Sequence, residues 1–484
     1  MAKPLFPTTD AMRFFKYIAS YLCLLALLSS CKTYYQQNLE FHQYFERGNF
    51  LQAEKILEKN RKAAKSNHRL LYYLNLGTST FMAGNYELAN KYFEEAYQIG
   101  DDLSKNYFQE AAALLINPNI SPYRGESFEL VLMHYYKALA FLKMGDYKAA
   151  LVECRRMNIK LLALSDSRVG DKKYREDAFF HLLMGIIYDA NQEYNNAFIA
   201  YRNSLNIFEK SYTEMFGVPV PEQLKKDLIR TAHLSGLDEE RQQYEEAFGL
   251  SYEPLPSNTG SLVFFWHNGL GPIKAENTLE FATVRRNGRV NFNHPQFREN
   301  NFSFDLSDED YNSSGLIGLE VVRVVLPKYV ERPNYFRQAS LRFKGQEYPL
   351  ELGQNLTAIA FKTLQERMAT ELAKSLLRTA LKKAAEYKLK KEKEGIGELF
   401  GFFAQFTEQA DTRAWQTIPS SVHYARLVLP EGNQQVHRDP KEGVVGSGVQ
   451  GRADERGSKE FLDIGEPDVL GRSHEVPIQE DERH

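Results

Sequence analysis

A histidine and a run of carboxylates are the residues of this 484-residue chain whose types best suit acid–base or metal chemistry. His267 stands in FWHNGLGPIKAE, and Asp305, Asp308 and Asp310 stand in DLSDEDYN. Together they would suit a general base or a metal site, which makes a hydrolase one hypothesis. The spacings HExxH, HxxEH and GxSxG are absent from the sequence, and the acidic run lacks the glycine and terminal glutamate of a calcium loop. We therefore predict no enzyme activity, no cofactor and no metal.

Cys31 is a second residue with chemistry of its own. It ends the run LSSC, which follows an apolar stretch over 17–28, and Arg13 and Lys16 precede that stretch. A basic start, a short apolar core and small residues before a cleavage point are typical of a secretory signal. LSSC is similar to the bacterial lipobox. That resemblance implies removal of a signal peptide over 1–30 and acylation of Cys31, with palmitate or similar chains.

An acylated Cys31 would tie the chain to a bacterial membrane, because several fatty chains on one residue make attachment effectively permanent. We expect a cell-envelope location, most naturally the outer membrane, with the periplasmic or surface face left open. Translation from Met1 or from Met12 would preserve the signal. The net charge of −3 gives no general attraction to nucleic acid, so we predict envelope proteins and the membrane as partners and no nucleic acid.

The N-terminal half repeats one helical pattern four times. In each copy an aromatic residue follows a turn and precedes a small residue by three positions, as in Phe50 and Ala53, Tyr86 and Ala89, Tyr147 and Ala150, and Tyr194 and Ala197. This pattern resembles the tetratricopeptide repeat. The resemblance implies a solenoid of helix pairs over 31–250. A further helical stretch over 221–248 would then cap its end.

The residue types of the repeats suit close helix packing. Small residues allow the two helices of a pair to approach, at Gly77, Ala138 and Gly185. Larger or apolar residues on the second helix would fill the contact, at Phe93, Cys154 and Tyr201. We therefore expect Cys154 to be a buried packing residue and not a reactive thiol.

The tetratricopeptide template places several apolar residues of the first helices on the concave face of the solenoid. These are Leu74, Phe81, Leu132, Tyr135, Leu139, Phe179, Leu182 and Ile186. Such a groove could bind a hydrophobic peptide, or a lipid in a lipid- or membrane-handling module. The alternative, which we favour, is that the cap, an insertion or the second domain fills it, because an apolar patch of that size is a liability in water.

The pattern changes to strands after a Pro- and Ser-containing linker over 251–260. One long helix, over about 356–394, interrupts the strands, and we expect it to pack on a sheet with a basic face toward water. The alternative is a membrane-surface helix. The fold class is therefore mainly α: a tetratricopeptide-like α-solenoid, then a smaller α+β domain over 261–432 with a long helix, then a disordered tail over 433–484.

Two motifs of the second domain are more specific than a core requires. FWHNGLGPIKAE and ADTRAWQTIPSS offer five candidate contact residues, namely His267, Asn268, Asp411, Arg413 and Trp415. We expect Asp411 to pair with Arg413 and Trp415 to lie over a neighbouring strand. Over residues 12–432 the chain resembles uncharacterised bacterial envelope lipoproteins with tetratricopeptide repeats, in which HNGLGPIK and DTRAWQTIP are similar to recurring motifs. That resemblance implies an envelope role near cell-wall synthesis or lipoprotein assembly. Our leading hypothesis is a docking scaffold for proteins.

Overall fold

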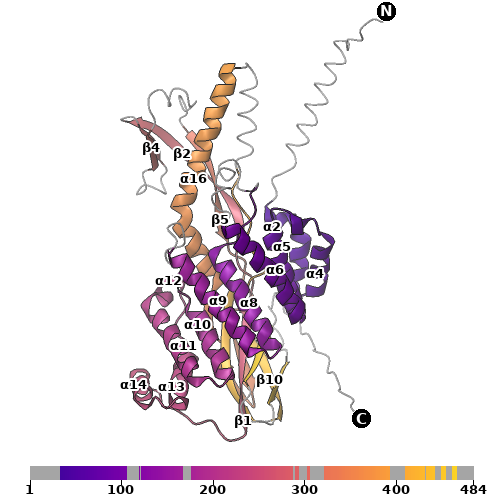
Figure 1. The fold of residues 1–484 in the computed structure, drawn as a ribbon, viewed down its shortest axis with the longest axis vertical. Coiled ribbons are helices and arrows are strands. Elements are labelled where there is room, and N and C mark those ends of the chain that lie inside the picture. Colours follow the sequence, from indigo (N-terminus) through magenta and orange to yellow (C-terminus); the bar gives the residue numbers. More distant parts are fainter. Residues whose placement is uncertain are drawn as a thin grey trace, which may run out of the picture.

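The computed structural model begins with paired helices and continues with strands and one long helix (Figure 1). The predicted signal peptide and Cys31 lie outside the residues that it describes. Those residues are 33–105, 119, 121–166, 176–286, 289–293, 302–305, 321–392, 409–430, 432–441, 448–453 and 460–465.

The helices of the first half form pairs in which each helix packs on its neighbour in the chain, and each pair packs on the next (Figure 1). A short helix, α2 (Tyr34–Gln37), precedes them. This arrangement confirms the predicted tetratricopeptide-like solenoid. The pairs are α3 (Leu39–Glu46) with α4 (Phe50–Lys59), α5 (Arg69–Met82) with α6 (Tyr86–Lys105), α8 (Ser127–Lys143) with α9 (Tyr147–Asp166), α10 (Ala178–Ala190) with α11 (Tyr194–Ile207), and α13 (Glu222–Leu234) with α14 (Asp238–Phe248).

The predicted helical cap consists of a pair of helices, α13 and α14. Gly236 takes a φ of +71° between α13 and α14, as Gly84 takes +87° between α5 and α6. Glycine adopts this left-handed conformation without steric cost, so it ends a helix and lets the chain reverse. The segment over 221–248 therefore adds one more hairpin to the solenoid. A π-helix over Phe208–Tyr212 and α12 (Thr213–Phe216) connect it to α11.

Close contact within the pairs follows the predicted small residues. A Cβ atom added to Gly77 would lie 2.6 Å from the Phe93 ring, and one added to Gly185 would lie 2.4 Å from the Tyr201 ring. Cys154 is buried among apolar side chains, and this burial raises the pKa of its thiol. The predicted packing role of these positions is confirmed.

The strands that the structure describes in the second half form three sheets. The central sheet has the order β12-β1-β9-β8, built from β1 (Thr259–Asn268), β8 (Glu351–Asn355), β9 (Ser421–Pro430) and β12 (Glu460–Gly465). A second sheet has the order β11-β10-β6-β7, from β6 (Gln338–Phe343), β7 (Gln346–Pro349), β10 (Gly432–Lys441) and β11 (Gly448–Ala453). A third has the order β4-β3-β2-β5, from β2 (Ile273–Arg286), β3 (Arg289–Asn293), β4 (Phe302–Asp305) and β5 (Val321–Val330).

The long helix α16 spans Leu356–Glu392, close to its predicted bounds. Its Leu372 and Leu376 are buried in one cluster with apolar side chains of β2 and β5. The helix therefore packs on a sheet, as expected. Within the predicted tail over 433–484, the structure describes most of β10 together with β11 and β12.

The two faces of the central sheet pack against different partners. Val263 and Phe265 of β1 belong to the same apolar core as the solenoid helices. Leu262 and Phe264, on the opposite face, pack with side chains of β6 and β10. The central sheet is thus a middle layer between the solenoid and the second sheet, in agreement with the strands seen behind α8 and α10 in Figure 1. One continuous core joins the two predicted domains.

Candidate functional site

The two motifs of the second domain lie next to each other. Strands β1 and β9 pair antiparallel with Asn268 opposite Ser421. Beyond the strands, the backbone N–H of Gly271 donates to the carbonyl of Ile418 at 2.7 Å, and the N–H of Ser420 donates to the carbonyl of Asn268 at 3.1 Å. The sequence segments 265–276 and 410–420 therefore form one structural unit.

This unit fills the concave face of the solenoid. The Phe265 ring meets Phe179 of α10 edge-on, with ring centroids 6.0 Å apart. The Trp415 ring lies 5.6 Å from Tyr136 of α8. All the residues predicted to line a groove are buried: Leu74, Phe81, Leu132, Tyr135, Leu139, Phe179, Leu182 and Ile186. The second domain of the same chain occupies that face, which is the alternative that we favour, and the face is therefore not a groove open to a partner peptide or lipid.

His267 is part of this buried contact. Its Nε2 atom lies 2.8 Å from the hydroxyl of Tyr135, and its ring lies near the ring of Tyr136. Burial lowers the pKa of His267 to about 3, so the imidazole is neutral at physiological pH. The surroundings suit a packing residue with one hydrogen bond. They do not give the histidine the access to water or substrate that a general base requires. Asp308 and Asp310 lie outside the described residues, as does the side chain of Asp305.

Asp411 and Arg413 form the predicted pair. The guanidinium of Arg413 donates to both carboxylate oxygens of Asp411 at 2.8 Å. It also donates to the carbonyl of Ser121 at 2.8 Å and lies over the ring of Tyr123. The pair therefore holds the loop before α8 against the second domain. The Arg413 cation keeps the pKa of the Asp411 carboxyl below its usual range, although the partial burial of this side chain acts in the opposite direction.

Trp415 lies between solenoid helices and not over a neighbouring strand, which corrects the sequence prediction. Its indole N–H is shared between the hydroxyls of Thr78, at 3.1 Å, and Thr417, at 2.9 Å. Its backbone N–H donates to the carboxylate of Glu129 on α8 at 2.7 Å. The apolar ring of the indole therefore packs against solenoid side chains, and its N–H group has hydrogen-bond acceptors.

Glu129 is a buried acid with hydrogen-bond donors around it. The hydroxyl of Tyr123 donates to it at 2.6 Å, and the backbone N–H of Glu126 donates at 3.0 Å. Burial and the neighbouring carboxylate of Glu126 raise the pKa of Glu129 to about 7. Glu126 itself forms ion pairs with Lys274 of β2 and Arg367 of α16, so two more elements of the second domain bind this corner of the solenoid.

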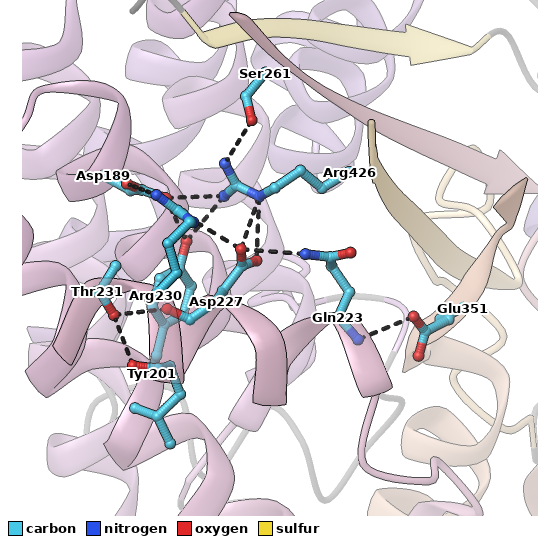
Figure 2. A network of polar contacts seen from close by, with 10 residues as sticks. Asp189, Tyr201, Gln223, Asp227, Arg230, Thr231, Ser261, Glu351 and Arg426 are labelled. Carbon is cyan, nitrogen blue, oxygen red and sulfur yellow. Dashed lines mark hydrogen bonds and ion pairs between the residues drawn. The ribbon is translucent and has the colours of Figure 1, made fainter. Parts of the chain in front are cut away.

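A second polar junction, absent from the sequence predictions, lies further along the solenoid (Figure 2). Arg426 of β9 reaches Asp227 at 2.9 Å and Asp189 at 3.0 Å. Arg230 contacts the same two carboxylates. Arg426 also donates to the hydroxyl of Tyr201 at 3.1 Å. We call these residues, Asp189, Tyr201, Asp227, Arg230 and Arg426, the four-charge cluster.

Two further contacts strengthen this end. The carboxylate of Glu351 on β8 accepts a hydrogen bond from the backbone N–H of Gln223 near the start of α13 (Figure 2). It accepts another from the backbone N–H of Glu222. Gln354 donates to Asp177 at 2.7 Å, and Asp177 caps α10 through the N–H of Phe179. Carboxylates are favourable at helix N-termini because the N–H groups there lack partners within the helix.

One cavity of about 480 Å³ lies where the two motifs meet α16. Asn268, Asn334, Thr357, Ser420 and His423 are among its lining residues. Several of the polar groups bond to one another, as in Asn334 to Ser420 at 3.0 Å and Thr357 to Ser420 at 2.9 Å. Asn268 donates to the carbonyl of Phe336 at 2.9 Å. These side chains hold the motifs together at the edge of the cavity.

The side chains and helices of the described part of the chain bear on metal binding and on membrane spanning. It holds no cluster of three or more His, Cys, Asp or Glu side chains that could bind a metal ion. None of its helices is both long and apolar enough to cross a bilayer. The apolar run before Cys31 lies outside that part.

Comparison with known proteins gives weak likenesses only. No protein-family model matches the sequence, and no curated protein is significantly similar to it. Among solved structures, a putative kinesin light chain with TPR-like repeats from Podosopora anserina is 17% identical, with 44% of this chain and 90% of that chain covered and a TM-score of 0.30. The MamA protein is 15% identical (44% and 94%, TM-score 0.27), and BtubC from P. vanneervenii is 14% identical (45% and 80%, TM-score 0.29). At these scores the repeat architecture rests on the helix pairs described above.

Proposed function

We propose that this protein is a lipid-anchored docking scaffold of the bacterial cell envelope that binds other proteins. The observation that carries the proposal is the filled concave face of the solenoid. The residues whose types best suit chemistry or specific binding all help to join the two domains. They are His267, Asp411, Arg413 and Trp415. Their role is to join the two domains into one body, which leaves the outer faces of the solenoid helices to hold partners.

The start of the fold supports anchoring close to a membrane. Thr33 caps α2 through its side chain, and the next residue, Tyr34, is buried and donates its backbone N–H to Thr412 at 3.3 Å. The described fold thus extends back to Thr33, two residues after Cys31. A fully extended chain covers at most about 3.6 Å per residue, so an acylated Cys31 would hold the body within about 10 Å of the bilayer surface.

The anchor is tested by metabolic labelling with a fatty-acid probe. We expect label on the full-length wild-type protein and none on Cys31→Ala. The Cys154→Ala variant is the matched control, because it removes the buried thiol and leaves Cys31 in place. Label that persists on Cys31→Ala, or a wild-type protein that is never labelled, contradicts the anchor.

The scaffold is tested by affinity purification of the full-length protein from cross-linked cells. We expect one or more envelope proteins in constant ratio to the bait, retained by the wild type and lost when the four-charge cluster is broken by Arg426→Gln. Repeated recovery of the bait alone contradicts a scaffold role. Within the envelope, machinery for cell-wall synthesis or lipoprotein assembly is the class of partner that we propose.

A further inference from the structure

The outer face of α9 carries an exposed stripe of apolar and basic side chains. Val152 is 43% exposed, Ile159 is 65% exposed and Leu162 is 55% exposed. Lys148 and Arg155 are exposed between and beside them. The spacing of three and four residues places all five on one side of the helix. We call these residues, Lys148, Val152, Arg155, Ile159 and Leu162, the α9 stripe.

The equivalent faces of the neighbouring second helices differ in chemistry. On α6 the exposed residues are polar or charged, namely Glu87, Lys91, Glu95, Gln98 and Asp102. On α11 they are mainly amides, namely Asn195, Asn196 and Asn206 with Ile199. The repeat unit of α9 therefore shows a row of exposed apolar side chains where α6 shows polar ones. On α11 the row is reduced to Ile199, which stands at the position equivalent to Val152. Single exposed apolar residues are ordinary, but an ordered row on one helix marks a contact surface.

The charge of the α9 stripe is positive. Of the two acidic residues of α9, Asp166 is the last residue of the helix. The other, Glu153, is buried and bonds to His134, Lys137 and Arg156. Lys148 and Arg155 take part in none of the ion pairs found among the described residues. Their cations are free to meet carboxylates brought by another molecule.

We infer that the α9 stripe docks an acidic amphipathic helix of a partner protein. This inference rests on the proposed scaffold function and names the surface that serves it. Apolar residues of the partner at positions i, i+3 or i+4, and i+7 would contact Val152 and Ile159, and flanking Glu or Asp residues would face Lys148 and Arg155. Helices dock on helices in this manner with axes about 8–10 Å apart, which matches a stripe one helix wide.

The neighbouring surface favours a helix over an anionic bilayer as the occupant. Helix α6 lies beside α9, since the Arg156 guanidinium lies over the ring of Tyr97 and 3.7 Å from Glu94. The outer face of α6 carries Glu95 beside the Glu87–Lys91 ion pair, so its net charge is negative and anionic lipid would be repelled there. A narrow partner helix can contact the cations of α9 without covering α6.

Site-specific photo-crosslinking in cells tests the inference. The full-length protein carries p-benzoylphenylalanine in place of Ile159, with the same replacement of Ile199 on α11 as the matched control. We expect position 159 to crosslink to one segment of another protein, which mass spectrometry identifies as an amphipathic helix rich in Glu and Asp. Adding Arg155→Glu should lower the crosslink yield at least fivefold while the melting temperature stays unchanged.

Several outcomes would overturn the inference. They are crosslinks to lipid only, crosslinks to a second copy of this chain, the same products at positions 159 and 199, a basic or strand-forming target segment, or no crosslink at all. Affinity purification separates this failure from failure of the scaffold. If envelope partners still copurify at wild-type ratio with an Ile159→Asp/Arg155→Glu variant, the scaffold stands and the α9 stripe is not its docking surface.

Discussion

Two polar junctions hold the second domain in the solenoid, and they are built differently. The first, which we call the motif junction, contains Arg413, Trp415 and Glu129 near the first repeats. The second is the four-charge cluster near the last repeats. In the four-charge cluster, two cations share two buried carboxylates. In the motif junction, the ion pair of Asp411 and Arg413 is separate from the buried Glu129. Glu129 accepts hydrogen bonds from uncharged hydroxyl and backbone N–H groups.

The two junctions differ in how well water can solvate a carboxylate that has lost its partner. The side chain of Asp411 is 29% exposed, so water reaches it, whereas its partner Arg413 is 3% exposed. Asp189 and Asp227 are both buried. A buried charge that loses its partner is strongly destabilising, while one that water can reach is much less so. The four-charge cluster should therefore be the less tolerant junction.

Arg426→Gln is expected to have the largest effect. It leaves two buried carboxylates with one guanidinium, and a broken buried pair costs about 3–5 kcal/mol. The free energy of unfolding, measured by urea denaturation with intrinsic tryptophan fluorescence, should fall by that amount. The matched control is Arg342→Gln on β6, whose ion pair with Glu347 is exposed and should contribute about 0–1 kcal/mol. Equal losses in the two variants would show that the four-charge cluster is not special.

A pH series should separate the two junctions. The pKa of Glu129 is raised to about 7 in the folded protein, so protonated Glu129 stabilises the fold. That contribution is complete below its ordinary pKa of 4.5 and is lost as the pH rises through 7. The pKa of Asp189 is lowered, mainly by Arg230 and Arg426 against the effect of burial, so its contribution is lost as the pH falls below its ordinary value of 3.8.

Unfolding of the wild type and of Glu129→Gln at pH 5 and pH 8 measures the first effect. The stability of the wild type relative to the variant should fall by about 2–3 kcal/mol between these pH values. The comparison cancels other groups, such as His267, whose lowered pKa makes its contribution fall in the opposite direction, as the pH drops below 6.5. A pH-independent difference between wild type and variant would contradict the raised pKa of Glu129.

The same contrast explains what the sequence could predict. Asp411 and Arg413 stand two positions apart, so their pairing is a local feature that a motif reveals. The repeats were predictable because small and aromatic residues recur at fixed offsets. Asp189, Asp227 and Arg426 belong to three elements far apart in the chain, and only the tertiary fold brings them together. A signal did exist, since Arg426 is the charged residue within the apolar strand sequence VHYARLVL.

The placement of the second domain could not be predicted for a related reason. Periodicity showed which helix residues are apolar, but the same apolar face suits a partner peptide, a lipid or a strand of the same chain. In the structure Phe265 and Trp415 fit between solenoid helices, so a part of the same chain covers that face. Such a fit depends on the shapes of the packed side chains, which periodicity does not describe. The position of Trp415 was therefore predicted wrongly although its importance was recognised.

Arg413→Gln is expected to cost less than Arg426→Gln. The variant loses charge-assisted hydrogen bonds to Asp411 and to the carbonyl of Ser121, which contribute about 1.5–3 kcal/mol, while water can solvate Asp411. Hydrogen exchange followed by mass spectrometry should show faster exchange over 121–130 and 410–420, with the region of α13 unaffected. A loss as large as that of Arg426→Gln would mean that the partial exposure of Asp411 does not protect the motif junction.

Thr78→Val is expected to give the smallest effect, and it tests the indole contact directly. The substitution keeps the size of the side chain and removes the hydroxyl that accepts the Trp415 N–H, while Thr417 still accepts it at 2.9 Å. The free energy of unfolding should fall by about 0.5–1.5 kcal/mol, the usual contribution of a neutral hydrogen bond.

Thr231→Val is the matched control, because the hydroxyl of Thr231 bonds to the carbonyl of Asp227 within its own helix. Both variants should lower the free energy of unfolding, but only Thr78→Val should change the fluorescence of the folded state, since Trp415 is one of two tryptophans in the chain. An unchanged emission spectrum in Thr78→Val would mean that the indole is held by shape alone, and the motif junction would then depend on packing and not on its polar contacts.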